Sequence, residues 1–160
     1  MATEVELAWA AGILDGEGCI SIILTPPGKY SVTPRHVLHV KVTMGHLPTV
    51  ERFAVILGNG TVQKHAARST RTNASYSYIV QARKADAVLQ LLRPYLVTKA
   101  EEADVAFEFA ALPLGPRGGK KGGKAVPQEI LELRNHCYWK LRRLKPRWRF
   151  YSEGMEGCSD

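Results

Sequence analysis

Cysteine is scarce in this sequence, and its three copies do not form a recognisable set. Cys19, Cys137 and Cys158 are odd in number and widely spaced, with no Cys-x-x-Cys pair among them. Disulfide frameworks and four-ligand zinc sites usually show paired or closely spaced cysteines. Neither is indicated here, and reduced thiols are expected.

Long apolar runs are also absent. No uninterrupted apolar stretch approaches the roughly 20 residues that a helix needs to cross a bilayer, so no membrane partner is expected. The N-terminal residues 1–4 lack the basic start of a secretory signal peptide. With 45% hydrophobic and 23% charged residues in 160 positions, the composition is that of a globular protein of one domain. We expect it to be intracellular, in the cytoplasm or in an organelle.

Acidic residues are scarce between residues 114 and 149, where basic residues gather. Residues 114–149 hold 11 of the 22 Lys and Arg but only two acids, Glu129 and Glu132, so their local charge is +9. The rest of the chain carries −2, within a total of +7. A basic segment on a nearly neutral body favours a polyanionic partner, because neutralised phosphates release condensed counterions. Nucleic acid is the favoured interpretation. The alternative is a solvated tail that promotes solubility.

The stretch from Leu7 to Ile20, LAWAAGILDGEGCI, begins as a helix-length apolar segment. Thr3 and Glu6 form a capping box before it. Apolar side chains then surround the helix, which predicts burial on nearly all sides. Small residues recur at three- and four-residue spacing, so we expect them to share one face: Ala8, Ala11, Gly12 and Gly16. Since glycine costs about 1 kcal/mol relative to alanine in a helix, close approach by a second helix is favoured. The alternative is that Gly12 only accommodates a bulky neighbour.

Two acids, Asp15 and Glu17, close this apolar segment. They lie at the C-terminal end of the predicted helix, where the helix dipole disfavours negative charge. A metal ion would remove that cost. Mg²⁺ is a suitable ion because it takes few protein ligands and completes its shell with water and phosphate oxygens. The alternative is that both acids end the helix and face solvent.

The segment LAWAAGILDGEG resembles the signature motif of the LAGLIDADG homing endonucleases, in a chain with one copy of that motif. The order of downstream segments continues the resemblance to about residue 110. It implies an α+β fold with an αββαββα-type core, whose antiparallel sheet forms a DNA-binding saddle, here with an extra basic C-terminal helix. It also implies a homodimer in which the motif helices of two subunits pair. The interface residues would be Ala8, Ala11, Gly12, Asp15 and Gly16.

The resemblance further implies an activity, namely metal-dependent hydrolysis of double-stranded DNA at a long pseudo-palindromic site. Glu17 would bind the catalytic Mg²⁺, or Mn²⁺ in its place, together with the carbonyl of Gly16. Lys99 would lie near the scissile phosphate, although a lysine at a helix start is commonplace. Family members often carry a water-ordering polar residue near positions 44–46, where only His46 is suited; a cap or surface role is the alternative. An intron-encoded mobile element is the implied source, and no organic cofactor is expected.

Residue periodicity predicts the remaining elements. Strands are expected at 19–24, 35–43, 61–66 and 75–82, and helices at 47–57, 84–96, 100–111 and 128–144, with a break near Pro94. Tyr76, Tyr78 and Val80 are expected to face the core. One LAGLIDADG domain would cover 1–151, with its core at about 3–111, a basic loop at 112–127 and a disordered tail at 152–160.

The first two predicted strands each have an apolar face and a polar or basic face. Such a pair can enter the major groove of DNA, and the alternative is a sheet that faces solvent. We expect DNA contacts on the polar face, in the loops and in the basic C-terminal region. They are Ser21, Ile23, Thr25, Arg35, His39, Lys41, Gln63, His65, Arg68, Arg71, Ser75, Ser77, Lys120, Lys121, Lys124, Arg142 and Arg143. Among these, Gln63 and His65 are placed on the DNA face by the resemblance to the endonuclease family.

Three other functions stay open at this point. The same scaffold can serve as an RNA maturase that assists intron splicing, or as a DNA-binding regulator without cleavage, and an unrelated basic RNA-binding domain is the third. The intact Glu17 argues against the regulator. The single-stranded RNA modules fit poorly, because no aromatic cluster lies on the polar sheet face. No covalent nucleophile is indicated, because no Ser or Cys lies in a His-paired arrangement.

Overall fold

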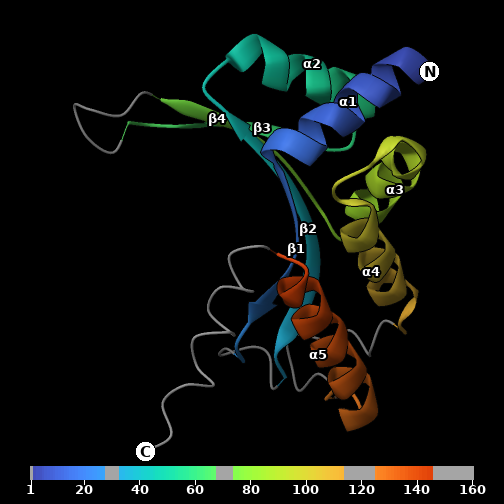
Figure 1. The fold of residues 1–160 in the computed structure, drawn as a ribbon. Helices are drawn as coiled ribbons and strands as arrows, with labels where there is room; N and C mark the ends of the chain where they lie inside the picture. Colours follow the sequence, from blue (N-terminus) through green and yellow to red (C-terminus); the bar gives the residue numbers. More distant parts are fainter. Residues whose placement is uncertain (1, 28–32, 68–73, 114–124, 146–160) are drawn as a thin grey trace, which may run out of the picture.

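A four-stranded antiparallel sheet runs through the protein, and helices cover one of its faces (Figure 1). The computed structural model describes residues 2–27, 33–67, 74–113 and 125–145. Its elements are α1 (Glu4–Glu17), β1 (Gly18–Thr25), β2 (Arg35–Met44), α2 (Leu47–Leu57), β3 (Thr61–His65), β4 (Ser75–Gln81), α3 (Ala82–Leu92), the 3₁₀ turn η1 (Arg93–Tyr95), α4 (Ala100–Ala111) and α5 (Gln128–Arg143). The order from α1 to α3 is αββαββα, so the predicted α+β fold class is confirmed.

Several predicted positions lie outside the described residues. They are the expected DNA contacts Arg68, Arg71, Lys120, Lys121 and Lys124, most of the basic loop, and the tail at 152–160. Within the described ranges, no helix is both long and apolar enough to cross a membrane.

Local signals set the element boundaries close to the predicted ones. The capping box is present: the Thr3 N–H donates to Glu6 Oε2 at 2.9 Å, and the Glu6 N–H donates to Thr3 Oγ1 at 3.3 Å. Pro94 lies in η1, directly after α3 ends at Leu92, which confirms the expected break. The helix α3 begins at Ala82, two residues before the predicted start at residue 84.

The strands are ordered β1-β2-β4-β3, and every neighbouring pair is antiparallel. Alternate side chains point to the helices and are buried, including Ile20, Val40, Tyr78 and Val80. The predicted facing of β4 is thus confirmed for Tyr78 and Val80. We call the other side of the sheet the open face; it carries Cys19, Ser21, Ile23, Thr25, Arg35, Val37, His39, Lys41, Thr43, Thr61, Gln63, His65, Ser75, Ser77, Ile79 and Gln81.

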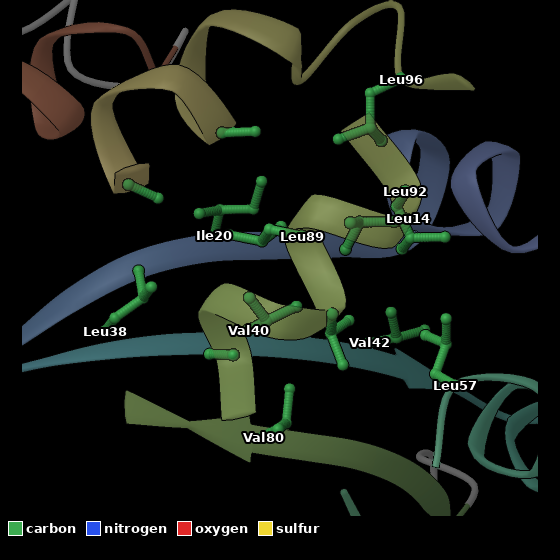
Figure 2. Close-up of a cluster of buried hydrophobic side chains, with 14 of the residues drawn as sticks. Leu14, Ile20, Leu38, Val40, Val42, Leu57, Val80, Leu89, Leu92 and Leu96 are labelled. Atoms are coloured by element: carbon green, nitrogen blue, oxygen red, sulfur yellow. The ribbon is translucent and has the colours of Figure 1, made fainter. Parts of the chain in front are cut away.

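The hydrophobic core lies between the sheet and the helices. Figure 2 shows side chains of α1, α3 and the sheet meeting in one cluster, among them Leu14, Leu89 and Val40. These three side chains are fully buried. Because α1 contributes Leu14 to this cluster, its C-terminal end is held directly against the start of β1.

One side of α1 is less enclosed than predicted. Ala10, Ala11 and Leu14 are fully buried, but Val5 is 80% exposed, and Ala8 and Gly12 are also exposed. The prediction of burial on nearly all sides is therefore wrong for the single protomer. Among the described residues, no segment of the chain covers this side of α1.

The helix α5 packs against the helix-covered side of the sheet through His36 of β2. His36 Nε2 lies 2.8 Å from Asn135 Oδ1, and the Tyr138 ring meets the imidazole edge-on at 6.3 Å between centroids. His36 is only 7% exposed, and its Nδ1 has no hydrogen-bond partner in the described part of the chain. Burial lowers the pKa of His36, its hydrogen bond to Asn135 raises that pKa, and the nearby Arg134 charge lowers it.

This depressed pKa predicts a loss of stability in mild acid. The unfolded chain takes up the His36 proton near its ordinary pKa of about 6.5, before the folded protein does. The stabilisation is therefore full above that pH and is lost as the pH falls below it. Urea unfolding at pH values of about 7.5 and 5.5 should show a smaller decrease in stability for His36→Gln than for the wild type. An equal decrease in both proteins would mean that His36 is not the responsible group.

Candidate functional site

Asp15 joins the end of α1 to the start of α4. Its Oδ2 accepts hydrogen bonds from the backbone N–H groups of Val97 at 2.8 Å and Thr98 at 3.2 Å, and its Oδ1 accepts from that of Lys99 at 2.8 Å. These N–H groups lead into α4, whose positive dipole end favours a carboxylate. The unfavourable position of Asp15 at the end of α1 is thus offset by α4, and the alternative that it simply faces solvent is wrong.

The same contact brings Lys99 to the end of α1. Lys99 Nζ donates to the backbone carbonyl of Asp15 at 2.5 Å. The ammonium group therefore lies beside the peptide unit that leads into Gly16 and Glu17, where the carbonyl end of the helix attracts a cation. The predicted cation is thus brought from a distant position in the sequence to a carbonyl two residues before the predicted metal-binding acid, Glu17.

Removing the Asp15 carboxylate should loosen this junction. The Asp15→Ala variant leaves three backbone N–H groups without their acceptor, and we expect it to lower the free energy of unfolding by about 1–2 kcal/mol. Urea denaturation measures the loss, and hydrogen exchange should show the fastest new exchange at Val97 to Lys99. The matched control is Asp86→Ala on α3, where the carboxylate accepts a hydrogen bond from the Gln90 side chain and from no other described residue. Equal effects of the two substitutions would contradict the assignment.

Glu17 and Gly16 present oxygen ligands at the point where α1 meets the sheet. Both residues are exposed, and Glu17 is the last residue of α1. Carboxylate and carbonyl oxygens are the ligands that Mg²⁺ prefers, with water and phosphate completing its shell. Among the described residues, no three His, Cys, Asp or Glu side chains come together as a metal cluster. The donor set of one protomer therefore fits a largely hydrated Mg²⁺ ion rather than a closed protein cage.

The small residues of α1 are not explained by packing within the chain. A Cβ atom added at Gly12 or Gly16 would meet nothing within 4 Å. The alternative that Gly12 makes room for a bulky neighbour is thus wrong for the described structure. Ala8, Gly12 and Gly16 are exposed together, and we call these three residues the small-residue face. Ala11 is 0% exposed and packs inside the protomer, so its predicted place in a dimer interface is wrong.

Most predicted DNA-contact residues of the strands do lie on the open face. The register pairs Cys19 with Lys41 and Ser21 with His39, and β3 and β4 bring Gln63 opposite Ser77. Two of the expected contacts are nevertheless covered. His39 is 9% exposed and Ser77 is 0% exposed, because they lie on the inner strands β2 and β4, with neighbouring strands on both sides. Burial and the adjacent Lys41 charge lower the pKa of His39.

His46 lies exposed at the start of α2. Its Nδ1 is 2.8 Å from Thr49 Oγ1 in the first turn of that helix, as expected of the surface alternative. Arg142 and Arg143 lie on α5, on the helix-covered side of the sheet rather than on the open face. Arg142 stacks on the rings of Tyr138 and Trp139, while Arg143 is exposed. Their contact with DNA stays a prediction.

Lys145 has a role that the sequence did not reveal. It lies just after the end of α5. Its Nζ donates to the Ile20 carbonyl at 2.7 Å and lies 3.2 Å from Glu102 Oε2. Since β1 is an edge strand, this contact joins the segment that follows α5 to the edge of the sheet.

Comparison with known proteins shows similarity at the level of structure. The sequence matches no protein-family model and no curated protein. The homing endonuclease I-CvuI, in complex with the I-CreI target, matches with a TM-score of 0.71 and 20% identity over 89% of this chain and 83% of that chain. The archaeal intron-encoded homing endonuclease I-Vdi141I, in complex with DNA, gives 0.68 and 14% over 89% and 85%. The LAGLIDADG meganuclease I-CpaMI, bound to uncleaved DNA, gives 0.56 and 16% over 66% and 36%. At these identities the likeness is one of fold.

Proposed function

We propose that this chain, which has the fold of the LAGLIDADG homing endonucleases, is a metal-dependent endonuclease that cuts both strands of a specific DNA duplex. The observation that carries the proposal is the junction of α1 with the sheet. There Glu17 is exposed at the end of α1, and the Lys99 ammonium donates to the Asp15 carbonyl two residues before it, where the chain enters the sheet with its polar open face. An acid that can hold a metal ion and a nearby cation suit phosphodiester hydrolysis, and a polar sheet face suits binding of the duplex.

The open face would hold the duplex. Its outward side chains include hydrogen-bonding groups suited to base edges, such as Gln63 and His65, and the cations Arg35 and Lys41. The net charge of +7 adds a general attraction to phosphates. We propose double-stranded DNA as the partner for these reasons.

Glu17 and the carbonyl of Gly16 would hold Mg²⁺, with Mn²⁺ as a substitute. When bound, such an ion lowers the pKa of a coordinated water and neutralises charge on a phosphate. Lys99 contributes a fixed positive charge beside the same point, which stabilises negative charge that develops on the scissile phosphate. Asp15 is a positioning residue: its carboxylate accepts from the Lys99 backbone N–H, and its backbone carbonyl accepts from the Lys99 ammonium.

A homodimer would complete the site. The small-residue face of α1 is open, and its glycines destabilise the helix without serving any described contact inside the protomer. Pairing with the same face of a second copy explains both facts. It also brings two Glu17 carboxylates close together, where they repel unless cations lie between them. An intracellular location and an intron-encoded origin are part of the same proposal.

The test is selection of cleaved and bound duplexes from a randomised library, with Mg²⁺ and, in parallel, with Ca²⁺. We expect cleavage at one long, nearly palindromic sequence with Mg²⁺. Binding without cutting under any divalent ion would contradict the endonuclease and would favour a regulator on the same scaffold. Specific binding of intron RNA in place of duplex DNA would favour the maturase.

A further inference from the structure

A chain of three hydrogen-bonding side chains crosses the open face from β3 to β2. His65 Nε2 lies 2.9 Å from Ser77 Oγ, and Ser77 Oγ lies 2.7 Å from Thr43 Oγ1. Ser77 and Thr43 are register partners on β4 and β2, whereas His65 reaches Ser77 diagonally from β3. Ser77 is fully buried, and the other two are partly exposed. Two accessible groups are thus connected through one buried hydroxyl.

The two end residues of this hydrogen-bonded row, His65 and Thr43, lie next to different parts of the proposed site. His65 uses Nε2 for Ser77, so Nδ1 is the ring nitrogen left to meet a base edge. Thr43 follows Val42, whose register partner is Gly18, the residue after Glu17. In the register of the sheet, Thr43 is therefore the open-face position of β2 nearest to Glu17.

The directions of the hydrogen bonds along the chain are coupled. Ser77 has one hydroxyl hydrogen, so it donates to one neighbour and accepts from the other. If Ser77 donates to His65 Nε2, the imidazole carries its hydrogen on Nδ1, and Thr43 donates to Ser77. If His65 donates from Nε2, Nδ1 becomes an acceptor, and Ser77 donates to Thr43. Donation to Ser77 from both sides would leave a buried O–H without an acceptor, which is disfavoured.

We propose that Ser77 is a positioning residue that couples base recognition by His65 to the orientation of the Thr43 hydroxyl beside Glu17. A base that accepts from Nδ1, such as guanine through O6 or N7, directs the Thr43 hydrogen toward Ser77. A base that donates to Nδ1, such as adenine or cytosine through its amino group, makes Ser77 donate to Thr43. The Thr43 hydroxyl hydrogen is then free to point toward Glu17. This inference rests on the proposed function and adds to it a route by which the base sequence affects the cleavage step.

The test is a double-mutant cycle on single-turnover cleavage of the selected duplex. His65→Phe and Thr43→Val are made singly and together, first with Ser77 present and then in the Ser77→Ala background. With Ser77 present, the change in the cleavage rate constant caused by both substitutions together should differ from the product of the two single changes by about threefold or more. In the Ser77→Ala background, the two single changes in the rate constant should simply multiply. Ser75→Ala, at the register partner of His65, is the matched control and should keep the coupling.

Independent effects in the presence of Ser77 would overturn the proposal, and so would coupling that persists in Ser77→Ala. A second measurement needs no DNA. The ¹⁵N chemical shifts of the His65 ring report its tautomer, and Thr43→Val should change them although β2 and β3 are not neighbours. Unchanged shifts would also overturn the proposal. If the wild type cuts no duplex, the proposed function fails, while the ring shifts still decide whether the hydrogen-bond chain exists.

Discussion

The Glu17→Gln variant is expected to lose DNA cleavage by at least about 10²-fold while it binds the same duplex as tightly as the wild type. Glutamine keeps the size and hydrogen-bonding shape of glutamate but removes the negative charge that a divalent ion needs. Glu17 is exposed at the end of α1, so the substitution should not disturb the core. Binding would be measured by titration with labelled duplex in Ca²⁺, and cleavage by single-turnover assay in Mg²⁺.

The matched control for this variant is Glu4→Gln. Glu4 is also an exposed glutamate of α1, but it lies in the first turn, at the opposite end of the helix. The Glu4→Gln variant should cleave the duplex as fast as the wild type. Persistent cleavage by Glu17→Gln would contradict the metal assignment, and a parallel loss of binding would mean that Glu17 holds DNA rather than a metal ion.

The Gly12→Leu variant is expected to weaken dimer formation by about 10²-fold, because a bulky side chain would separate the paired helices in both subunits at once. In the protomer, by contrast, the same substitution should raise the free energy of unfolding. A Cβ atom at Gly12 meets no other described segment within 4 Å, and leucine favours a helix by about 0.8 kcal/mol over glycine. Sedimentation velocity measures the dimerisation, and urea unfolding at low protein concentration measures the stability of the protomer.

Ala87→Leu is the control for added bulk, since Ala87 is exposed on α3, a different helix. It should leave the dimer unchanged. If Gly12→Leu dimerises as strongly as the wild type, the small-residue face is not the interface. If it weakens dimerisation and also destabilises the protomer, the glycine serves a contact within the chain.

The fold could be predicted because its signals are local. The capping box at Thr3, the alternation in β2 and the break at Pro94 each depend on residues within one element. The family resemblance also placed Gln63 and His65 on the DNA-facing side of the sheet, and the register puts both on the open face. The family resemblance added the association of the strands in one antiparallel sheet, which periodicity alone does not determine.

The details of the site could not be predicted in the same way, because they depend on contacts between distant segments. Asp15 and Lys99 are 84 positions apart, and no local pattern indicates that one carboxylate accepts from the turn before α4. Ser77 looked like an outward contact because the period of two describes the face of a strand but not how its neighbours cover it. Ala11 was assigned to the interface for a similar reason: helical spacing shows that residues are close, but not where the core boundary falls.

The central claim is that two copies of Glu17, one from each subunit, each support cleavage of one DNA strand. It is tested most directly with two copies of the chain joined by a flexible linker, in which only one copy carries Glu17→Gln. The linked wild-type pair should cut both strands of the selected duplex, and the mixed pair should nick a single strand. Cutting of both strands by the mixed pair would contradict the claim. So would a mixed pair that leaves both strands intact while the linked wild-type pair cuts them.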